Sequence, residues 1–396
     1  MREYCKRKIW TNLRSVAWAV PLVGWAAGCG SSATDDANDP ALIAAGMDTF
    51  RNDTFGDEQL WTDTLMMHTV ISTAVDPMTA LSVGIKVDAS VLPAGILGTV
   101  DLTSPATTIA LLKLGAIVGV KGTVVSQGGQ DTLTSVGITC AFCHSTVDDS
   151  VMAGIGNRLD GVANRDLNPG AIIALSPAVT ADQKTVYNSW GPGKYDPRYN
   201  IDGQNGPVFI PPAYGLRNSP HATFSGDGDI RYWNNYVAVT QMGGQGTFKD
   251  DRVGIDHTLP AGAEDLVKPK LEGLRAYQFS LNVPAPPTGS FDGAAAARGK
   301  TIFDHSCASC HQAAAGFSQD QLHAASDTGM DPTYANRSAT KQYRTTPLRA
   351  LWQHAPYFHD GSAATLNDVV DHYDQQLALG LAVSDKTDLV EYLKSL

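Results

Sequence analysis

The amino-acid sequence predicts a mainly α-helical protein with two units, the first of which is enlarged by extra helices and loops. Three observations lead to this fold class. Apolar residues recur at the helical period in residues 58–75, 107–120, 294–303 and 385–396. A Pro-rich segment, NVPAPPTGS at residues 282–290, divides the chain of 396 residues as an interdomain linker does. One Cys-x-x-Cys-His motif lies on each side of that linker.

The composition excludes two classes of protein. The net charge is −11 and the chain has no runs of Lys and Arg, which argues against nucleic-acid binding. After the first thirty residues, the longest apolar stretch, residues 109–120, is too short to span a bilayer and contains Lys113. We therefore exclude an integral membrane enzyme. The 38 Gly and 21 Pro residues predict many turns and long loops between the helices.

Residues 1–28 resemble a bacterial lipoprotein signal peptide. Five basic residues precede an apolar stretch at 15–27, and small residues lead into Cys29. An ordinary cleaved signal peptide is the alternative. A lipidated Cys29 would anchor the protein to a membrane of a Gram-negative bacterium, facing the periplasm. The small, polar and acidic residues that follow predict a flexible tether over residues 29–45.

Four cysteines form two copies of one motif. Of the six cysteines, Cys5 lies in the signal and Cys29 at its end. The others occur in Cys140-Ala141-Phe142-Cys143-His144 and in Cys307-Ala308-Ser309-Cys310-His311. In the c-type haem attachment pattern, two thiols bind the haem vinyl groups and the adjacent His ligates the iron. The sequence therefore predicts two covalently bound haem c groups, with His144 and His311 as proximal ligands.

Three other roles for these cysteines explain the pattern less well. A zinc site usually brings its two Cys pairs within about 20 residues, whereas these pairs are more than 160 residues apart. A thioredoxin-like redox pair explains neither the adjacent His nor the duplication. Two structural disulfides would each close a short, strained ring.

The chain also resembles a known family. From Thr345 it reads TTPLRALWQHAPYFHDGSAATLNDVVDHYD, which resembles the bacterial di-haem cytochrome c peroxidase superfamily, including its quinone-maturing and rubber oxygenase branches. The match is specific in residues 346–349 and 356–361. In the first unit the resemblance rests on Arg-Asn-Ser-Pro at residues 217–220 and on Trp233, which follows at the family's spacing.

The resemblance implies two cytochrome c-like haem domains, residues 46–281 and residues 291–396. Haem 1, at the first motif, would be the reactive centre, and haem 2, at the second motif, would be the electron-transfer centre. Trp233 would relay electrons between them, with a plain core Trp as the alternative. A calcium ion would bind Asn218 together with two backbone carbonyl groups, those of His354 and Pro356.

Tyr373 is predicted to be the sixth ligand of haem 2. Thr365 and Asp368 form a capping-box pattern that starts a helix, and Tyr373 lies near the centre of the apolar face of that helix. Tyr373 also follows His359 at the offset where the family places an axial Met or Tyr. A core Tyr without a ligand role, or His372 in a shifted helix, are the alternatives.

The first unit departs from the family in two ways. No His occurs between His144 and His221, so haem 1 is predicted to be five-coordinate or water-bound, with His221 as the alternative ligand. The family's catalytic Glu is missing, and Val253 stands at its offset. Gln245 and Phe248 lie in the same stretch. The side-chain amide of Gln245 would transfer protons poorly. Phe248 resembles the apolar distal wall of the rubber oxygenases.

The sequence therefore predicts an exported di-haem oxidoreductase of the peroxidase type, with Trp233, Gln245 and Phe248 at the reactive site. An oxygenase acting on an organic substrate is one alternative, although Asp250 or Asp251 could supply the missing acid. A non-enzymatic electron carrier is the other. The expected partners are a small redox protein attracted to the acidic surface, and peroxide, oxygen or a small organic substrate.

Overall fold

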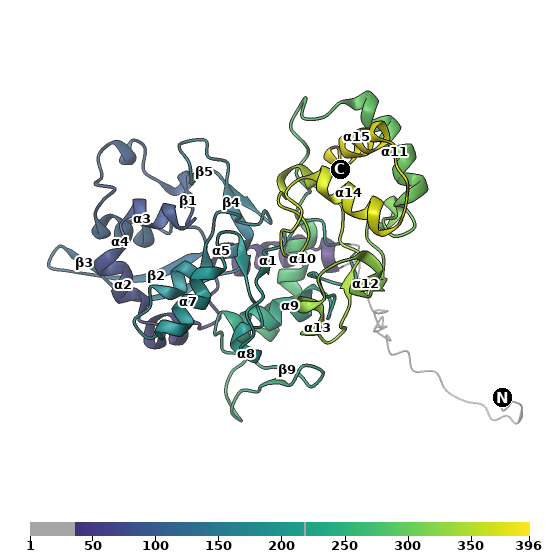
Figure 1. The fold of residues 1–396 in the computed structure, drawn as a ribbon. Coiled ribbons are helices and arrows are strands. Elements are labelled where there is room, and N and C mark those ends of the chain that lie inside the picture. Colours follow the sequence, from purple (N-terminus) through teal and green to yellow (C-terminus); the bar gives the residue numbers. More distant parts are fainter. Residues whose placement is uncertain (1–35, 218) are drawn as a thin grey trace, which may run out of the picture.

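Figure 1 shows the computed structural model, which describes residues 36–217 and 219–396. The chain is mainly helical, which confirms that part of the predicted fold class. The first unit, purple to teal, and the second unit, green to yellow, lie side by side. None of the described helices is long and apolar enough to cross a membrane. The predicted signal peptide, the lipidation site Cys29 and the predicted calcium ligand Asn218 lie outside the described residues.

Most helices of the first unit are short. They are α1 (Pro40–Asn52), α2 (Met67–Ala74), α3 (Pro77–Ser82), α4 (Pro105–Lys113), α5 (Ala141–His144), α6 (Pro169–Ala174), α7 (Ala181–Ser189), α8 (Tyr199–Asp202), α9 (Ile230–Tyr236) and α10 (Leu271–Ser280). A π-helical turn at Val237–Gln241 continues α9. The second unit contains α11 (Gly293–Ser306), α12 (Ala325–Thr328), α13 (Thr333–Asn336), α14 (Leu366–Gln376) and α15 (Val383–Lys394).

The described strands form two-stranded sheets. The pairs are β1 (Val87–Asp88) with β5 (Ile155–Gly156), β2 (Val120–Gln127) with β3 (Gln130–Ile138), β4 (Ser145–Val147) with β6 (Arg158–Asp160), β7 (Lys194–Tyr195) with β8 (Val208–Phe209), β9 (Phe248–Asp250) with β10 (Ile255–His257), and β11 (Leu322–His323) with β12 (Tyr343–Arg344). The first pair is parallel and the others are antiparallel. These small sheets stabilise the long loops, which the Gly and Pro content predicts.

The N-terminal helix begins within the segment that the sequence assigns to the tether. Pro40 occupies the first helical position of α1, and the Asp39 carboxylate accepts a hydrogen bond from the Ala41 amide at 2.9 Å. A proline at the first position and an Asp cap are strong start signals for a helix. The predicted tether 29–45 is therefore wrong at its C-terminal end, because its residues from Pro40 onward are helical.

Two predicted helical stretches also differ from the structure. The stretch 58–75 is divided at Met66, whose φ of 54° is left-handed, into a π-helical turn and α2. The stretch 107–120 is helical only as far as Lys113, because Gly115 and Gly119 take positive φ angles and Val120 begins β2. An apolar run that is rich in β-branched residues fits a strand as well as a helix.

Each unit has a hydrophobic core of its own. In the first unit α1 packs so closely on α10 that a Cβ atom on Gly46 would lie 1.8 Å from the carbonyl oxygen of Gly273. In the second unit α11 crosses α15 in the same way, with Gly299 against the backbone of Asp388. The core of the second unit contains Ala296, Phe303, Leu351, Leu366, Val370, Leu389, Val390, Tyr392 and Leu393. The Pro-rich residues 282–290 between the units contain no helix or strand.

A buried ion pair holds the two units together. The guanidinium of Arg337, on the second unit, donates hydrogen bonds to Asp196 at 2.9 Å and to Asp202 at 2.8 Å, on the first unit. The side chain of Arg337 is 3% exposed and that of Asp196 is fully buried. Removing one partner of such a pair leaves the other charge without compensation.

We therefore expect Arg337→Gln to lower the free energy of unfolding by about 3–5 kcal/mol, measured by chemical denaturation. Arg298→Gln is the matched control, because Arg298 also binds a carboxylate, Asp388, but its side chain is 62% exposed. A surface pair of this kind contributes about 0–1 kcal/mol. Equal losses in the two variants would show that the junction does not depend on the buried pair.

Candidate haem sites

The second Cys-x-x-Cys-His motif opens onto a large cavity. Helix α11 ends at Ser306, and the motif forms the tight turn that follows, from Cys307 to His311. The cavity has a volume of about 560 Å³, and both thiols, His311 and the apolar side chains of α11, α14 and α15 line it. The two cysteines are free thiols. A predominantly apolar cavity beside two thiols and an imidazole fits a covalently bound haem.

The ring of His311 is held in the orientation that an iron ligand requires. Its Nδ1 donates a hydrogen bond to the carbonyl oxygen of Phe317 at 2.9 Å, which leaves Nε2 with its lone pair. Burial lowers the pKa of His311, so the imidazole is neutral. Metal-bound histidines in proteins are commonly fixed by a hydrogen bond of this kind from the second ring nitrogen.

The histidine of the first motif is held in the same way. Strand β3 ends at Ile138 and leads directly into the motif, whose last four residues form α5. His144 Nδ1 donates to the carbonyl oxygen of Pro211 at 3.0 Å, and burial lowers the pKa of His144 to about 4. Cys140 and Cys143 are free thiols that pack against the large core of the first unit. These residues fit a second covalently bound haem.

The structure places Tyr373 on the wall of the cavity at the second motif. Tyr373 belongs to α14, which begins with the predicted capping box between Thr365 and Asp368. Burial, followed by the nearby sulfur atoms, raises the pKa of the Tyr373 hydroxyl to about 12. His372, the alternative ligand, instead binds the carbonyl oxygen of Thr328 through Nε2 at 2.7 Å.

Other possible iron ligands also line this cavity and were missed by the sequence analysis. They are Met330, His323, His354 and His359. Nε2 of each of these histidines lies within hydrogen-bond distance of a hydroxyl group, on Thr345, Tyr214 and Tyr343 respectively. His354 and His359 lie within the stretch that resembles the family, but no local pattern marks His323 or Met330, whose proximity to the cavity arises only when the loops fold over it.

Trp233 lies inside α9, in a cluster of aromatic rings. Its side chain is 4% exposed, and its ring contacts Tyr232 and Tyr236 with centroid distances of 5.8 and 5.3 Å. The guanidinium of Arg198 lies 6.0 Å from its ring centre. The buried Nε1–H has no partner among the described residues, so this donor is available to a group that is not part of the chain.

Phe248 and Gln245 follow α9 but have different surroundings. Phe248 is 3% exposed and packs edge-on against Tyr232 and Tyr236, so its ring belongs to the same aromatic cluster as Trp233. Gln245 is half-buried, and its Nε2 donates to the carbonyl oxygen of Gly56 at 3.3 Å.

The structure also shows the surroundings of Asp250 and Asp251, the two acids that could replace the missing Glu. The Arg252 guanidinium holds the pKa of Asp250 down at about 2, and the Tyr232 hydroxyl donates to the same carboxylate. The Asp251 side chain is 84% exposed and pairs with Lys249. Asp250 is therefore ionised at neutral pH and Asp251 faces solvent, so neither carboxyl is a buried proton donor.

One buried acid beside the first motif was missed by the sequence analysis. Asp57 is fully buried, and among the described residues its side-chain oxygens accept a hydrogen bond from the backbone amide of Ile138, two residues before Cys140. Burial raises the pKa of Asp57 to about 9, so it is neutral at pH 7. The sequence gives no signal for this position, since residues 57 and 138 meet only in the folded chain.

The predicted calcium site stays a prediction, because its side-chain ligand Asn218 lies outside the described residues. The carbonyl oxygen of His354 accepts a hydrogen bond from the Arg165 guanidinium at 3.2 Å. A guanidinium in this position repels a divalent cation. No cluster of three or more metal-ligating side chains occurs in residues 36–217 and 219–396. His221, the alternative ligand of haem 1, lies at the junction of the units, where its Nε2 pairs with Asp320 at 2.8 Å.

Comparison with known proteins identifies the second unit. Residues 296–396 match the cytochrome c family. Residues 296–396 form a cytochrome c domain. Covalent attachment of haem c at the second motif follows from this assignment.

A relative extends the similarity beyond the cytochrome c domain. The chain is 30% identical over an alignment of 193 residues to the hydrazine synthase subunit gamma of Kuenenia stuttgartiensis, and the match covers 37% of this chain and 54% of that subunit. The chain thus spans about half the length of this relative. The two matches show similarity to a cytochrome c domain and to this relative, and membership of the di-haem cytochrome c peroxidase superfamily stays a proposal.

Two solved structures are more distant. Hydrazine synthase of Kuenenia stuttgartiensis, pressurized with xenon, covers 50% of this chain and 74% of its own, with 20% identity and a TM-score of 0.35. A MauG-like protein associated with microbial copper homeostasis covers 50% of this chain and 77% of its own, with 14% identity and a TM-score of 0.34. Likenesses at this level do not define the sites.

Proposed function

We propose that the chain is an exported di-haem c-type cytochrome that acts as an oxidoreductase of the peroxidase type. Haem 1 at residues 140–144 is the reactive centre, and haem 2 at residues 307–311 is the electron-transfer centre. One observation carries the proposal. In each unit the motif His donates Nδ1–H to a backbone carbonyl, so that a neutral Nε2 is held ready for iron. The bound haems supply the one-electron chemistry.

The residues of the chain have distinct roles in this proposal. His144 and His311 hold the iron of haem 1 and of haem 2, and the Tyr373 hydroxyl is the sixth ligand of haem 2. Trp233 relays electrons between the units, which its buried and oxidisable ring in an aromatic cluster supports. Phe248, which belongs to that cluster, and Gln245 border the reactive site.

Two candidate functions differ in the oxidant that the protein uses. Reduction of a peroxide is the activity of the family and is our first proposal. Oxidation of an organic substrate with oxygen is the second, and the ionised state of Asp250 favours it, because cleaving a peroxide requires a group that moves a proton.

The location and partners complete the proposal. An acidic chain suits a small basic redox protein as electron donor or acceptor, because opposite net charges speed association. Export to the periplasm and a lipid anchor at Cys29 rest on the N-terminal sequence. Covalent attachment also suits an exported protein, because a haem bound through thioether bonds cannot dissociate from it.

The haem content tests the proposal. We expect the mature protein to carry the mass of two haem groups in denaturing mass spectrometry. The double variants Cys140→Ser/Cys143→Ser and Cys307→Ser/Cys310→Ser should each lose one haem and keep the other. A mature protein with one haem or none would overturn the di-haem proposal.

A further inference from the structure

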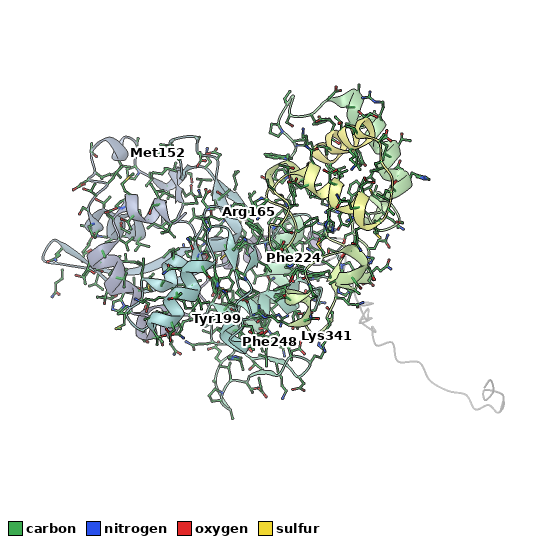
Figure 2. All side chains as sticks on the ribbon, viewed as in Figure 1. Met152, Arg165, Tyr199, Phe224, Phe248 and Lys341 are labelled. Atoms are coloured by element: carbon green, nitrogen blue, oxygen red, sulfur yellow. The ribbon has the colours of Figure 1, made fainter. Side chains whose placement is uncertain are left out.

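Three arginines line the cavity at the second motif without a carboxylate partner among the described residues. They are Arg165 from the first unit, and Arg344 and Arg349 from the second. Figure 2 labels Arg165 and Phe224, another lining residue, where the two units meet. The three guanidinium groups bind backbone carbonyls or hydroxyls and form no ion pair with the described residues.

Each arginine is anchored so that its charge stays at the cavity. Arg165 stacks over the ring of Phe209 with its guanidinium carbon 4.4 Å from the ring centre, and its buried Nη1 has no partner in the described chain. Arg344 is 8% exposed, donates through Nη1 to Ser219 Oγ at 3.0 Å, and has a buried Nε without a partner. Arg349 donates through Nε to the carbonyl oxygen of Gly316 at 3.2 Å.

Among the described residues, it is unusual that no carboxylate pairs with these buried arginines, although Asp327 also lines the cavity. The other buried arginines of the described residues that line no cavity are paired, as Arg198 is with Asp227 and Arg337 is with Asp196. Burial lowers the pKa of Arg165 and of Arg344 to about 10, because no negative charge compensates it. Buried charges and their unpaired donors are costly unless a partner meets them. The described residues supply no such partner, so we assign the compensating anion to the occupant of the cavity.

We propose that Arg165, Arg344 and Arg349 form a clamp that binds the two propionate carboxylates of haem 2. The inference rests on the proposed function, because it takes haem as the occupant. Guanidinium groups bind carboxylates through short, paired hydrogen bonds. The clamp directs the propionate edge of haem 2 toward the first unit, since Arg165 belongs to that unit and Arg344 contacts it through Ser219. Binding of haem 2 therefore also ties the units together.

The clamp affects the reduction of haem 2. Ferrous haem carries one positive charge less than ferric haem, so nearby arginines favour the reduced form. Loss of one arginine leaves a propionate charge uncompensated and favours the ferric form. We expect Arg344→Gln to lower the equilibrium constant for reduction of haem 2 by about tenfold, the scale of a unit charge in a partly buried site. Haem 1, in the same molecule, is the internal reference.

The experiment is an optical redox titration of the full-length holoprotein after its haem content has been measured. The variants are Arg344→Gln, Arg344→Lys and, as the matched control, Arg298→Gln, which removes one positive charge from the exposed face of α11. We expect Arg344→Gln to lower the midpoint potential of haem 2 and leave that of haem 1 unchanged. Arg344→Lys should restore most of the shift, whereas Arg298→Gln should change little.

Two results would overturn the clamp. If both haems are bound and Arg344→Gln shifts haem 2 no more than Arg298→Gln does, the clamp is wrong while the di-haem proposal stands. If the unmodified protein carries no haem at the second motif, both are wrong. Should Arg344→Gln fail to fold, Arg349→Gln is measured instead, with the same expected direction and the same two contradicting results.

Discussion

Tyr373→Phe is expected to change haem 2 from a six-coordinate to a five-coordinate centre. The substitution removes only the phenolic hydroxyl group, which is the polar group of Tyr373 at the cavity wall. The ferric optical and EPR spectra of haem 2 should become those of a high-spin centre. The potential should rise, because a phenolate ligand stabilises ferric iron, and axial ligands tune haem potentials over about 0.8 V.

Two variants control for this result. Tyr392→Phe removes the same atom from the same domain, but Tyr392 packs on Phe303 and does not line the cavity. His372→Gln removes the alternative ligand, whose Nε2 binds a backbone carbonyl in the structure. Both variants should keep the spectra of the unmodified protein. Unchanged spectra in Tyr373→Phe would show that this residue is a core Tyr.

Peroxide turnover is expected to be slow, by about 10²–10⁴ relative to an enzyme with a positioned acid, which is the usual contribution of general acid–base catalysis. The candidate acids support this expectation. Asp250 is ionised beside Arg252, Asp251 faces solvent, and Gln245 carries an amide. Steady-state peroxide reduction by the holoprotein measures the rate directly, and fast turnover would contradict the oxygenase alternative.

The variant Gln245→Glu tests whether the missing acid is the cause of slow peroxide turnover. The change preserves the size of a half-buried side chain and should raise peroxide turnover. Gln204→Glu, at an exposed loop position, is the control for the added charge and should have no effect. Phe248→Glu is unsuited to this purpose, because it would bury a carboxylate against Tyr232 and Tyr236. A rate unchanged by Gln245→Glu would show that Gln245 does not face the reacting peroxide.

Asp57 is a second possible source of the proton. Its carboxyl is neutral and buried, and it binds the backbone two residues before Cys140. If Asp57 donates the proton, Asp57→Asn should abolish the remaining turnover while both haems stay bound. Unchanged turnover in Asp57→Asn would instead show that Asp57 has a structural role at the end of β3.

The sequence predicted the features that depend on neighbouring residues. The helix leading into the second motif and the closing helix both follow from apolar periodicity, and they appear as α11 and α15. The capping box at Thr365 fixes where α14 begins and hence which side Tyr373 faces. A motif of five residues likewise contains its own chemistry, so both predicted haem-attachment motifs can be recognised without a structure.

Features that need distant residues could not be predicted. The three clamp arginines come from two units and share no local pattern, and only the folded chain reveals that none of them pairs with a carboxylate of the described residues. Asp57 is neutral only because the end of β3 covers it. The run 107–120 appeared helical because apolar residues alone do not distinguish the end of a helix from the start of a strand.

Binding of carbon monoxide to the reduced holoprotein tests the central claim most directly. We expect one equivalent to bind per chain, at haem 1, because no His follows the first motif before His221 while Tyr373 lies at the second. The double variant Cys140→Ser/Cys143→Ser should bind none. Binding at neither haem of the unmodified protein, or binding at haem 2 in that variant, would contradict a reactive haem 1 paired with an electron-transferring haem 2.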